Sequence, residues 1–164
     1  MPDRFYGRKI MQVQEFLKEK NVVFEALQHE PTYDAQRMAQ AVHTSGHEVA
    51  KTVLLRAGAN EAYVVAVLPA DEHVDFGKVG TALGCEVVEL ASEREIAAHC
   101  PDCEVGALPP FGSQYGMQTL VDTSLTEDED IVFEGNTHRE AIRMKFADFQ
   151  RLENPLVGSF VHSK

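Results

Sequence analysis

Apolar positions near the start of the chain recur with a helical period. Ile10, Val13, Phe16 and Leu17 fall on one face of a helix, and charged residues occupy the opposite face. This pattern predicts an amphipathic helix that ends near Asn21. The same reasoning, helped by Ser92 and Asp34 as N-caps and Gly84 as a C-terminal residue, predicts further helices. They cover residues 34–41, 74–83, 92–99 and 146–152.

Runs rich in β-branched residues predict strands between these helices. Residues 51–57 and 61–68 are two such runs, and Gly58-Ala59-Asn60 between them favours a hairpin turn. Several strand neighbours are joined by turns too short for a crossover helix. We therefore expect an α+β fold, a mixed and mostly antiparallel sheet surrounded by helices, in a single domain over residues 1–164. Shorter strands are predicted over residues 22–27, 86–90, 118–122, 130–134 and 141–144.

Composition and charge exclude several classes of protein. Apolar residues make up 44% of the 164 residues, which is enough for a packed core and excludes an intrinsically disordered chain. The formal net charge of −11 excludes a basic domain that coats nucleic acid. The longest apolar run, Ala62 to Leu68, is far shorter than the roughly 20 residues of a membrane span. The N-terminus lacks an apolar signal segment, so we expect a cytoplasmic protein without membrane association.

Three segments carry candidate chemistry. Lys51 opens a strong strand, where it is either an edge residue that reaches water or an ammonium directed at a phosphate or carboxylate. Residues 106–112 form a loop rich in glycine and proline, which is either a structural turn or a set of backbone N–H groups for an oxyanion. Residues 135–138 follow a strand and are either a plain turn or the polar mouth of a pocket.

Together, and in this order, these segments resemble the YbaK/prolyl-tRNA-synthetase-associated domain family. The matching motifs are Lys51-Thr52-Val53-Leu54, Gly106 followed by Pro110-Phe111-Gly112, and Gly135-Asn136-Thr137-His138. A late strand and helix, and the segment from His29 to Tyr33, also resemble the family. The similarity spans residues 10–152, and it rests on the order and spacing of motifs that are each weak alone.

The resemblance implies a free-standing aminoacyl-tRNA deacylase, a hydrolase of mischarged tRNA that needs no cofactor and no metal. Its expected substrate carries a small amino acid such as alanine or cysteine on tRNA(Pro) or a related tRNA, and its partners are the 3′ end of that tRNA and a synthetase that delivers it. The alternative is a non-catalytic relative that binds tRNA ends or a protein. The family's catalytic positions correspond to Lys51 and Gly106. The substrate-binding positions implied are Tyr33, Thr52, Leu108, Pro110, Phe111, Gly112, Gly135, Asn136, Thr137 and His138.

Two other patterns compete with this interpretation. Cys100 and Cys103 form a C-x-x-C pair beside His99, which is typical of a redox pair or half of a zinc site, but the chain has only one further cysteine. Incidental thiols are therefore expected. His43 and His47 have the spacing of zinc-binding helices, but the intervening sequence lacks the glutamate of such helices and contains a glycine.

Overall fold

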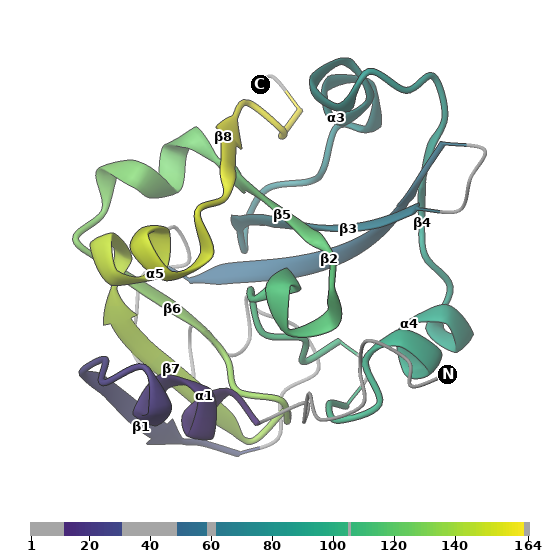
Figure 1. Ribbon diagram of the computed structural model, residues 1–164. Helices are drawn as coiled ribbons and strands as arrows, with labels where there is room; N and C mark the ends of the chain where they lie inside the picture. Colours follow the sequence, from purple (N-terminus) through teal and green to yellow (C-terminus); the bar gives the residue numbers. More distant parts are fainter. Residues whose placement is uncertain (1–11, 31–48, 59–61, 105, 163–164) are drawn as a thin grey trace.

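The computed structural model describes residues 12–30, 49–58, 62–104 and 106–162 (Figure 1). Two β-sheets form the framework of these residues, and helices pack around them. The predicted α+β class is confirmed, whereas the division of the strands into two sheets was not anticipated. None of the described helices is long and apolar enough to cross a membrane.

The larger sheet has five strands in the order β4-β2-β3-β5-β8. The predicted hairpin is present, since β2 and β3 pair antiparallel with Lys51 opposite Leu68. β5 and β8 extend the sheet in parallel with β3, and β4 pairs antiparallel with only the last part of β2. The five strands are β2 (Ala50–Ala57), β3 (Ala62–Pro69), β4 (Val88–Leu90), β5 (Gln118–Asp122) and β8 (Leu156–Gly158).

The smaller sheet is antiparallel throughout, in the order β1-β7-β6. It meets the larger sheet at the start of β2, where a parallel bridge joins Val49 to Val132 of β6. We call this junction the seam. Glu134, at the end of β6, lines a cavity together with the part of β2 that β4 does not cover. The three strands are β1 (Phe24–Gln28), β6 (Asp130–Glu134) and β7 (Glu140–Lys145).

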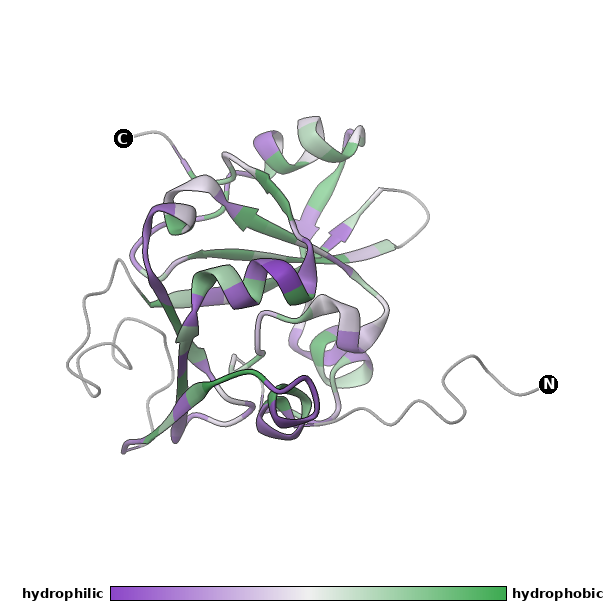
Figure 2. Ribbon diagram, turned by 60° about the vertical axis from the view of Figure 1, so that its left-hand side comes forward, coloured by the Kyte–Doolittle hydropathy of each residue, from purple (hydrophilic) through white to green (hydrophobic). Residues whose placement is uncertain are grey.

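A shared apolar core holds the two sheets together. Buried side chains from both sheets pack with α1 and α5, and at its centre the ring of Phe111 contacts three other phenylalanine rings. Figure 2 shows these strands as largely apolar, whereas the helices carry polar residues as well. Burial of one large apolar side chain contributes about 1.5–3 kcal/mol to the stability of the folded state. The cluster therefore fixes how the two sheets pack. The ring cluster comprises Phe16, Phe111, Phe133 and Phe149.

The helices begin and end where the local sequence predicts. Ser92 and Glu95 form the predicted capping box of α4, and Gly84 ends α3 with a φ of 71° that glycine tolerates. Two 3₁₀ helices and β8 were not predicted, and the helix expected over 34–41 lies outside the described residues. The helices are α1 (Val13–Glu19), α3 (Phe76–Leu83), α4 (Glu93–His99) and α5 (Phe146–Glu153), with η1 (Gly112–Tyr115) and η2 (Thr123–Glu127).

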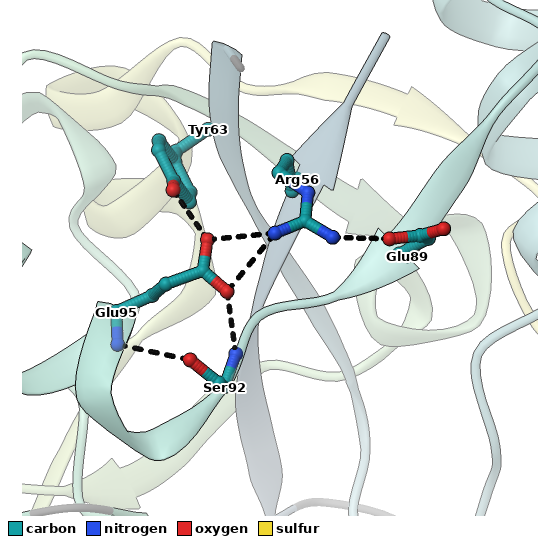
Figure 3. Close-up of polar contacts among 5 residues, drawn as sticks. All are labelled: Arg56, Tyr63, Glu89, Ser92 and Glu95. Carbon is teal, nitrogen blue, oxygen red and sulfur yellow. Dashed lines mark hydrogen bonds and ion pairs between the residues drawn. The ribbon is translucent and has the colours of Figure 1, made fainter. Parts of the chain in front are cut away.

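Glu95 anchors α4 to the larger sheet (Figure 3). Its carboxylate accepts hydrogen bonds from Tyr63 of β3, from Arg56 of β2 at 3.1 and 3.2 Å, and from the Ser92 backbone at 3.0 Å. Arg56 also pairs with Glu89 of β4. The hydrogen bonds, first that from the Ser92 backbone and then that from Tyr63, lower the pKa of Glu95 to about 2. This cluster fixes the start of the chain segment that runs from α4 to the site.

Candidate functional site

A cavity of about 170 Å³ lies beside the uncovered part of β2. Residues from three separate parts of the chain surround it: the start of β2, the loop after α4, and the end of β6. Two of these are segments that the sequence analysis singled out. The lining residues are Ala50, Lys51, Thr52, Val53, Gly106, Leu108 and Glu134.

Lys51 is half-buried where this cavity meets a second one. Burial lowers the pKa of Lys51, and the charges of Asp71 and Glu72 oppose that effect. A partly desolvated ammonium gains more from a bound anion than one in water would. The position of Lys51 therefore favours a site for a phosphate or carboxylate over an edge residue that simply reaches solvent.

The second cavity, of about 390 Å³, continues from Lys51 and Val53 toward α3 and the C-terminal segment. His73 and His162 bring two imidazole rings to it, and Phe76, an exposed aromatic residue, adds a ring on which a base can stack. Sequence analysis missed this cavity, because its two histidines lie far apart in the chain and match no motif. Its remaining lining residues are Val74 and Leu90.

Gly106 is the turn residue that brings the loop against His138. Its φ is 88°, a left-handed conformation that disfavours side chains, and the turn that contains it closes with a hydrogen bond of 2.9 Å from the Ala107 N–H to the Glu104 carbonyl. A Cβ on Gly106 would lie 3.2 Å from Cε1 and 3.6 Å from Nε2 of His138. Two of the predicted site residues are therefore in direct contact.

Glu134 ends β6 and holds a carboxylate in the same place. One of its oxygens, Oε2, lies 3.5 Å from Nδ1 of His138, and both side chains are only 5% exposed. Sequence analysis missed Glu134. The signal that was available is its position four residues before His138, directly ahead of the glycine that follows the strand.

Asn136 joins the site to α1 through its side chain. Its Oδ1 accepts a hydrogen bond from the Val13 N–H at 2.9 Å, and its Nδ2 donates to Asp102 at 3.1 Å. Tyr115 donates to the same carboxylate at 2.9 Å. These contacts give the Asn136 amide a structural role, because they fix the turn that carries His138. Substrate binding by Asn136 stays a prediction.

Gly135 and Thr137, the neighbours of Asn136, have structural contacts within the turn after β6. The Gly135 N–H donates to the Glu140 carbonyl at 2.9 Å, and a Cβ on this glycine would lie 3.2 Å from Ile142. The Thr137 hydroxyl accepts a hydrogen bond from the Arg139 N–H at 3.3 Å. Their predicted contact with substrate stays a prediction.

The motif Pro110-Phe111-Gly112 is buried behind the cavity. Phe111 lies in the central ring cluster, and a Cβ on Gly112 would approach Thr119 to 2.6 Å. The cavity is lined by Leu108 of the same loop, and not by this motif. The motif therefore shapes the loop from behind, and a direct role in binding stays a prediction. Ser113, which follows it, donates to Glu153 of α5 at 2.6 Å.

The alternative sites receive no support from the described residues. Cys100 and Cys103 are free thiols, and the hydrogen bond between them, together with burial, raises the pKa of Cys100, which disfavours a reactive thiolate. The described ranges contain no group of three or more His, Cys, Asp or Glu side chains that could hold a metal ion. Tyr33, His43 and His47 lie outside these ranges.

Comparison with known proteins places this geometry in a family. A family model for the aminoacyl-tRNA editing domain matches residues 29–152, which include the lining residues of the first cavity. The chain belongs to the aminoacyl-tRNA editing domain family. Both the predicted membership and the predicted enzyme class, a hydrolase of the aminoacyl-tRNA ester bond, are thereby confirmed.

Relatives of this editing domain share sequence or fold with it. The multifunctional Ser/Thr-tRNA deacylase ProXp-y of Escherichia coli K12 is 24% identical over 147 residues, 88% of this chain and 87% of the relative. A proline–tRNA ligase of Bacillus cytotoxicus is 36% identical over 63 residues, 38% of this chain and 11% of the ligase.

Solved structures show the same fold. A crystal structure whose description proposes a trans-editing enzyme for prolyl-tRNA synthetase aligns with a TM-score of 0.80 at 18% identity, covering 99% of this chain and all of the other. A hypothetical protein of known structure aligns with a TM-score of 0.84, also at 18% identity, covering 93% of this chain and all of the other.

Proposed function

We propose that this chain hydrolyses the ester of tRNA mischarged with a small amino acid. The observation that carries the proposal is the position of Lys51, whose ammonium lies between a small cavity closed by Gly106 and a larger one beside His73 and Phe76. In the proposed complex the aminoacyl group occupies the small cavity. The terminal adenosine occupies the larger cavity, with Lys51 holding the phosphate or ribose between them.

The volume of the small cavity favours a small aminoacyl group. At about 170 Å³ it has less than half the volume of the second cavity, which is about 390 Å³, so it suits the smaller aminoacyl group and the second cavity suits the nucleoside. Leu108 and Val53 supply the apolar part of the lining.

Hydrolysis in this site relies on positioning and charge. None of the residues that line the small cavity is a serine or cysteine, and Ser113 is bonded to Glu153 elsewhere. The ester is already activated relative to an amide. A water that attacks the ester carbonyl, and backbone donors of the 106–112 loop that stabilise the oxyanion, therefore suffice once the substrate is held. The ester C–O bond then breaks and the ribose oxygen takes the proton.

The experiment that tests the proposal is deacylation of a panel of aminoacyl-tRNAs by the wild type and by Lys51→Ala. We expect hydrolysis of tRNA(Pro) carrying alanine, cysteine or serine, and a loss of about 100-fold or more in Lys51→Ala. Lys145→Ala, an exposed lysine on β7, is the matched control and should retain full activity. Undiminished hydrolysis by Lys51→Ala would remove the proposed role of Lys51.

The competing class is a non-catalytic relative that binds tRNA ends or a protein. In that case the wild type hydrolyses nothing in the panel but still retains tRNA on a filter. The ProXp-y relative, named a deacylase, and the retained Lys51 favour the enzyme.

One observation favours a hydroxylated amino acid within the small class. The Thr52 hydroxyl is buried and has no hydrogen-bond partner among the residues that the structure describes, although Thr52 lines the small cavity. A seryl or threonyl side chain would give it one, and the ProXp-y relative is named for these two amino acids.

The test of this preference compares seryl- and alanyl-tRNA as substrates of Thr52→Val. A hydrogen bond between two hydroxyls contributes about 0.5–1.5 kcal/mol, so the preference for serine should fall by about 2- to 13-fold. Thr52→Ser keeps the hydroxyl and should retain the preference. An unchanged ratio in Thr52→Val would contradict the assignment.

The identity of the tRNA rests on the relatives alone. The partial match to a proline–tRNA ligase and the fold shared with a proposed prolyl trans-editing structure support tRNA(Pro) as the carrier. They equally support a synthetase as the partner that delivers it.

A further inference from the structure

The uncovered edge of β2 presents backbone groups to the small cavity. The Ala70 N–H donates to the Val49 carbonyl at 2.8 Å, so the odd-numbered residues of β2 direct their peptide groups toward β3. The even-numbered residues direct theirs toward the opposite edge, where the Ala91 N–H donates to the Leu54 carbonyl at 3.0 Å. Pairing with β4 begins only at Leu55. The carbonyl of Thr52 therefore faces the edge that the cavity occupies.

Glu134 brings a carboxylate to the same cavity from the other sheet. It is 5% exposed, and it lines the cavity together with Thr52. Its Oε2 lies 3.5 Å from Nδ1 of His138, and the two oxygens of a carboxylate offer about four lone-pair sites, so Glu134 can accept from a further donor beside the imidazole. A carboxylate and a backbone carbonyl that converge on one small cavity form an acceptor set suited to a primary ammonium, which has three donors.

We propose that Glu134, assisted by the Thr52 carbonyl, binds the α-ammonium group of the aminoacyl substrate. The inference rests on the function proposed above and deepens it. The site then accepts esters whose α-amino group is free and charged, and it rejects esters whose α-amino group is acylated, as in an N-acylated or peptidyl ester. In this arrangement Glu134 binds one end of the aminoacyl group and Lys51 binds the nucleotide end.

The test measures binding, so that it does not depend on catalysis. The probes are 3′-alanylamido-3′-deoxyadenosine, in which a stable amide replaces the ester, and the same compound acetylated on its α-amino group. We expect the wild type to bind the free amine at least tenfold more tightly, within the range of about 10- to 100-fold for a hydrogen bond to a charged group. Glu134→Gln should lose this preference, with its affinity for the acetylated probe unchanged within about threefold. Glu129→Gln, an exposed glutamate just before β6, is the matched control and should behave as the wild type.

The outcomes separate the two proposals. Equal affinity of the wild type for both probes, or no binding of the free amine at millimolar concentration, would overturn the ammonium site. So would a Glu134→Gln variant that weakens both probes equally, because that result assigns Glu134 only the placement of His138. Selective binding of the free amine by a wild type that hydrolyses no aminoacyl-tRNA would leave the ammonium site standing and overturn the hydrolase.

Discussion

At the scale of single residues, the contact between Gly106 and His138 shapes the candidate site most directly. The loop reaches the imidazole because residue 106 has no side chain and adopts a φ of 88°. Any Cβ there must either push the ring toward Glu134 or move the loop out of the cavity. Both requirements, for a left-handed backbone and for a close approach, select glycine at this position.

Gly106→Ala should therefore lower both stability and turnover. The left-handed backbone costs about 1–2 kcal/mol of unfolding free energy for a residue with a Cβ, and displacement of His138 reduces kcat/KM. Urea unfolding and deacylation kinetics measure the two effects. Gly84→Ala is the matched control, because Gly84 has a φ of 71° but no atom within 4 Å of the added Cβ. It should lose similar stability and keep its turnover. Normal turnover in Gly106→Ala would place the loop outside the site.

At the scale of elements, the carboxylate of Glu95 is the centre of the polar contacts between α4 and the larger sheet, beside the apolar packing of Ile96 and the ring contact of His99 with Tyr63. Tyr63, Arg56 and the capping box all converge on this carboxylate. The segment that follows α4 runs to Asp102, which binds Asn136 and Tyr115, and then to the loop of Gly106. We therefore expect that loss of the Glu95 contacts also displaces the loop of Gly106, because the chain and the hydrogen bonds of Asp102 connect α4 to that loop.

The low pKa of Glu95 predicts a dependence of stability on acid. Its folded pKa of about 2 lies below the ordinary value of 4.5, so the folded state favours the ionised form. The stability that this carboxylate contributes is complete above about pH 4.5 and is lost as the pH falls toward 2. Glu95→Gln should unfold at lower denaturant concentration at pH 7 and should show a shallower loss between pH 4.5 and 2. Glu93→Gln, on the exposed first turn of α4, is the control. Identical pH profiles for wild type and Glu95→Gln would contradict this assignment.

At the scale of the whole molecule, an acidic protein is proposed to bind a polyanion. A net charge of −11 opposes contact with the body of a tRNA. Among the described residues that line the proposed nucleotide cavity, the basic side chains are Lys51 and two histidines. This balance is consistent with a protein that binds the 3′ end and few phosphates.

The dependence of tRNA binding on salt should accordingly be weak. One or two phosphate contacts on single-stranded RNA give a slope of log K against log salt of about −0.7 to −1.4. Between 50 and 200 mM salt the affinity should therefore fall by about three- to sevenfold, as measured by filter binding. A loss of a thousandfold would show an extended tRNA interface and contradict this prediction.

Local signals in the sequence account for most elements and for part of the site. Capping residues, glycines and β-branched runs placed the hairpin, α3, α4 and the strands of the smaller sheet, because these depend on neighbours in the chain. β8 escaped detection, since it is three residues long and is defined only by its pairing with β5. Glu134 escaped for a similar reason. Its significance comes from facing β2 across the seam, a contact that no local pattern encodes.

The seam between the sheets has an evolutionary consequence. Lys51 and Thr52 belong to one sheet and Glu134 to the other, so the width of the small cavity depends on how the sheets pack. Core residues such as Val67 and Phe133 set that packing, although neither lines the cavity. With the aminoacyl group in the small cavity, as proposed, substrate preference can change through core substitutions as well as through changes of the lining residues. Paralogues with identical lining residues can diverge in the amino acid they accept by core substitutions alone.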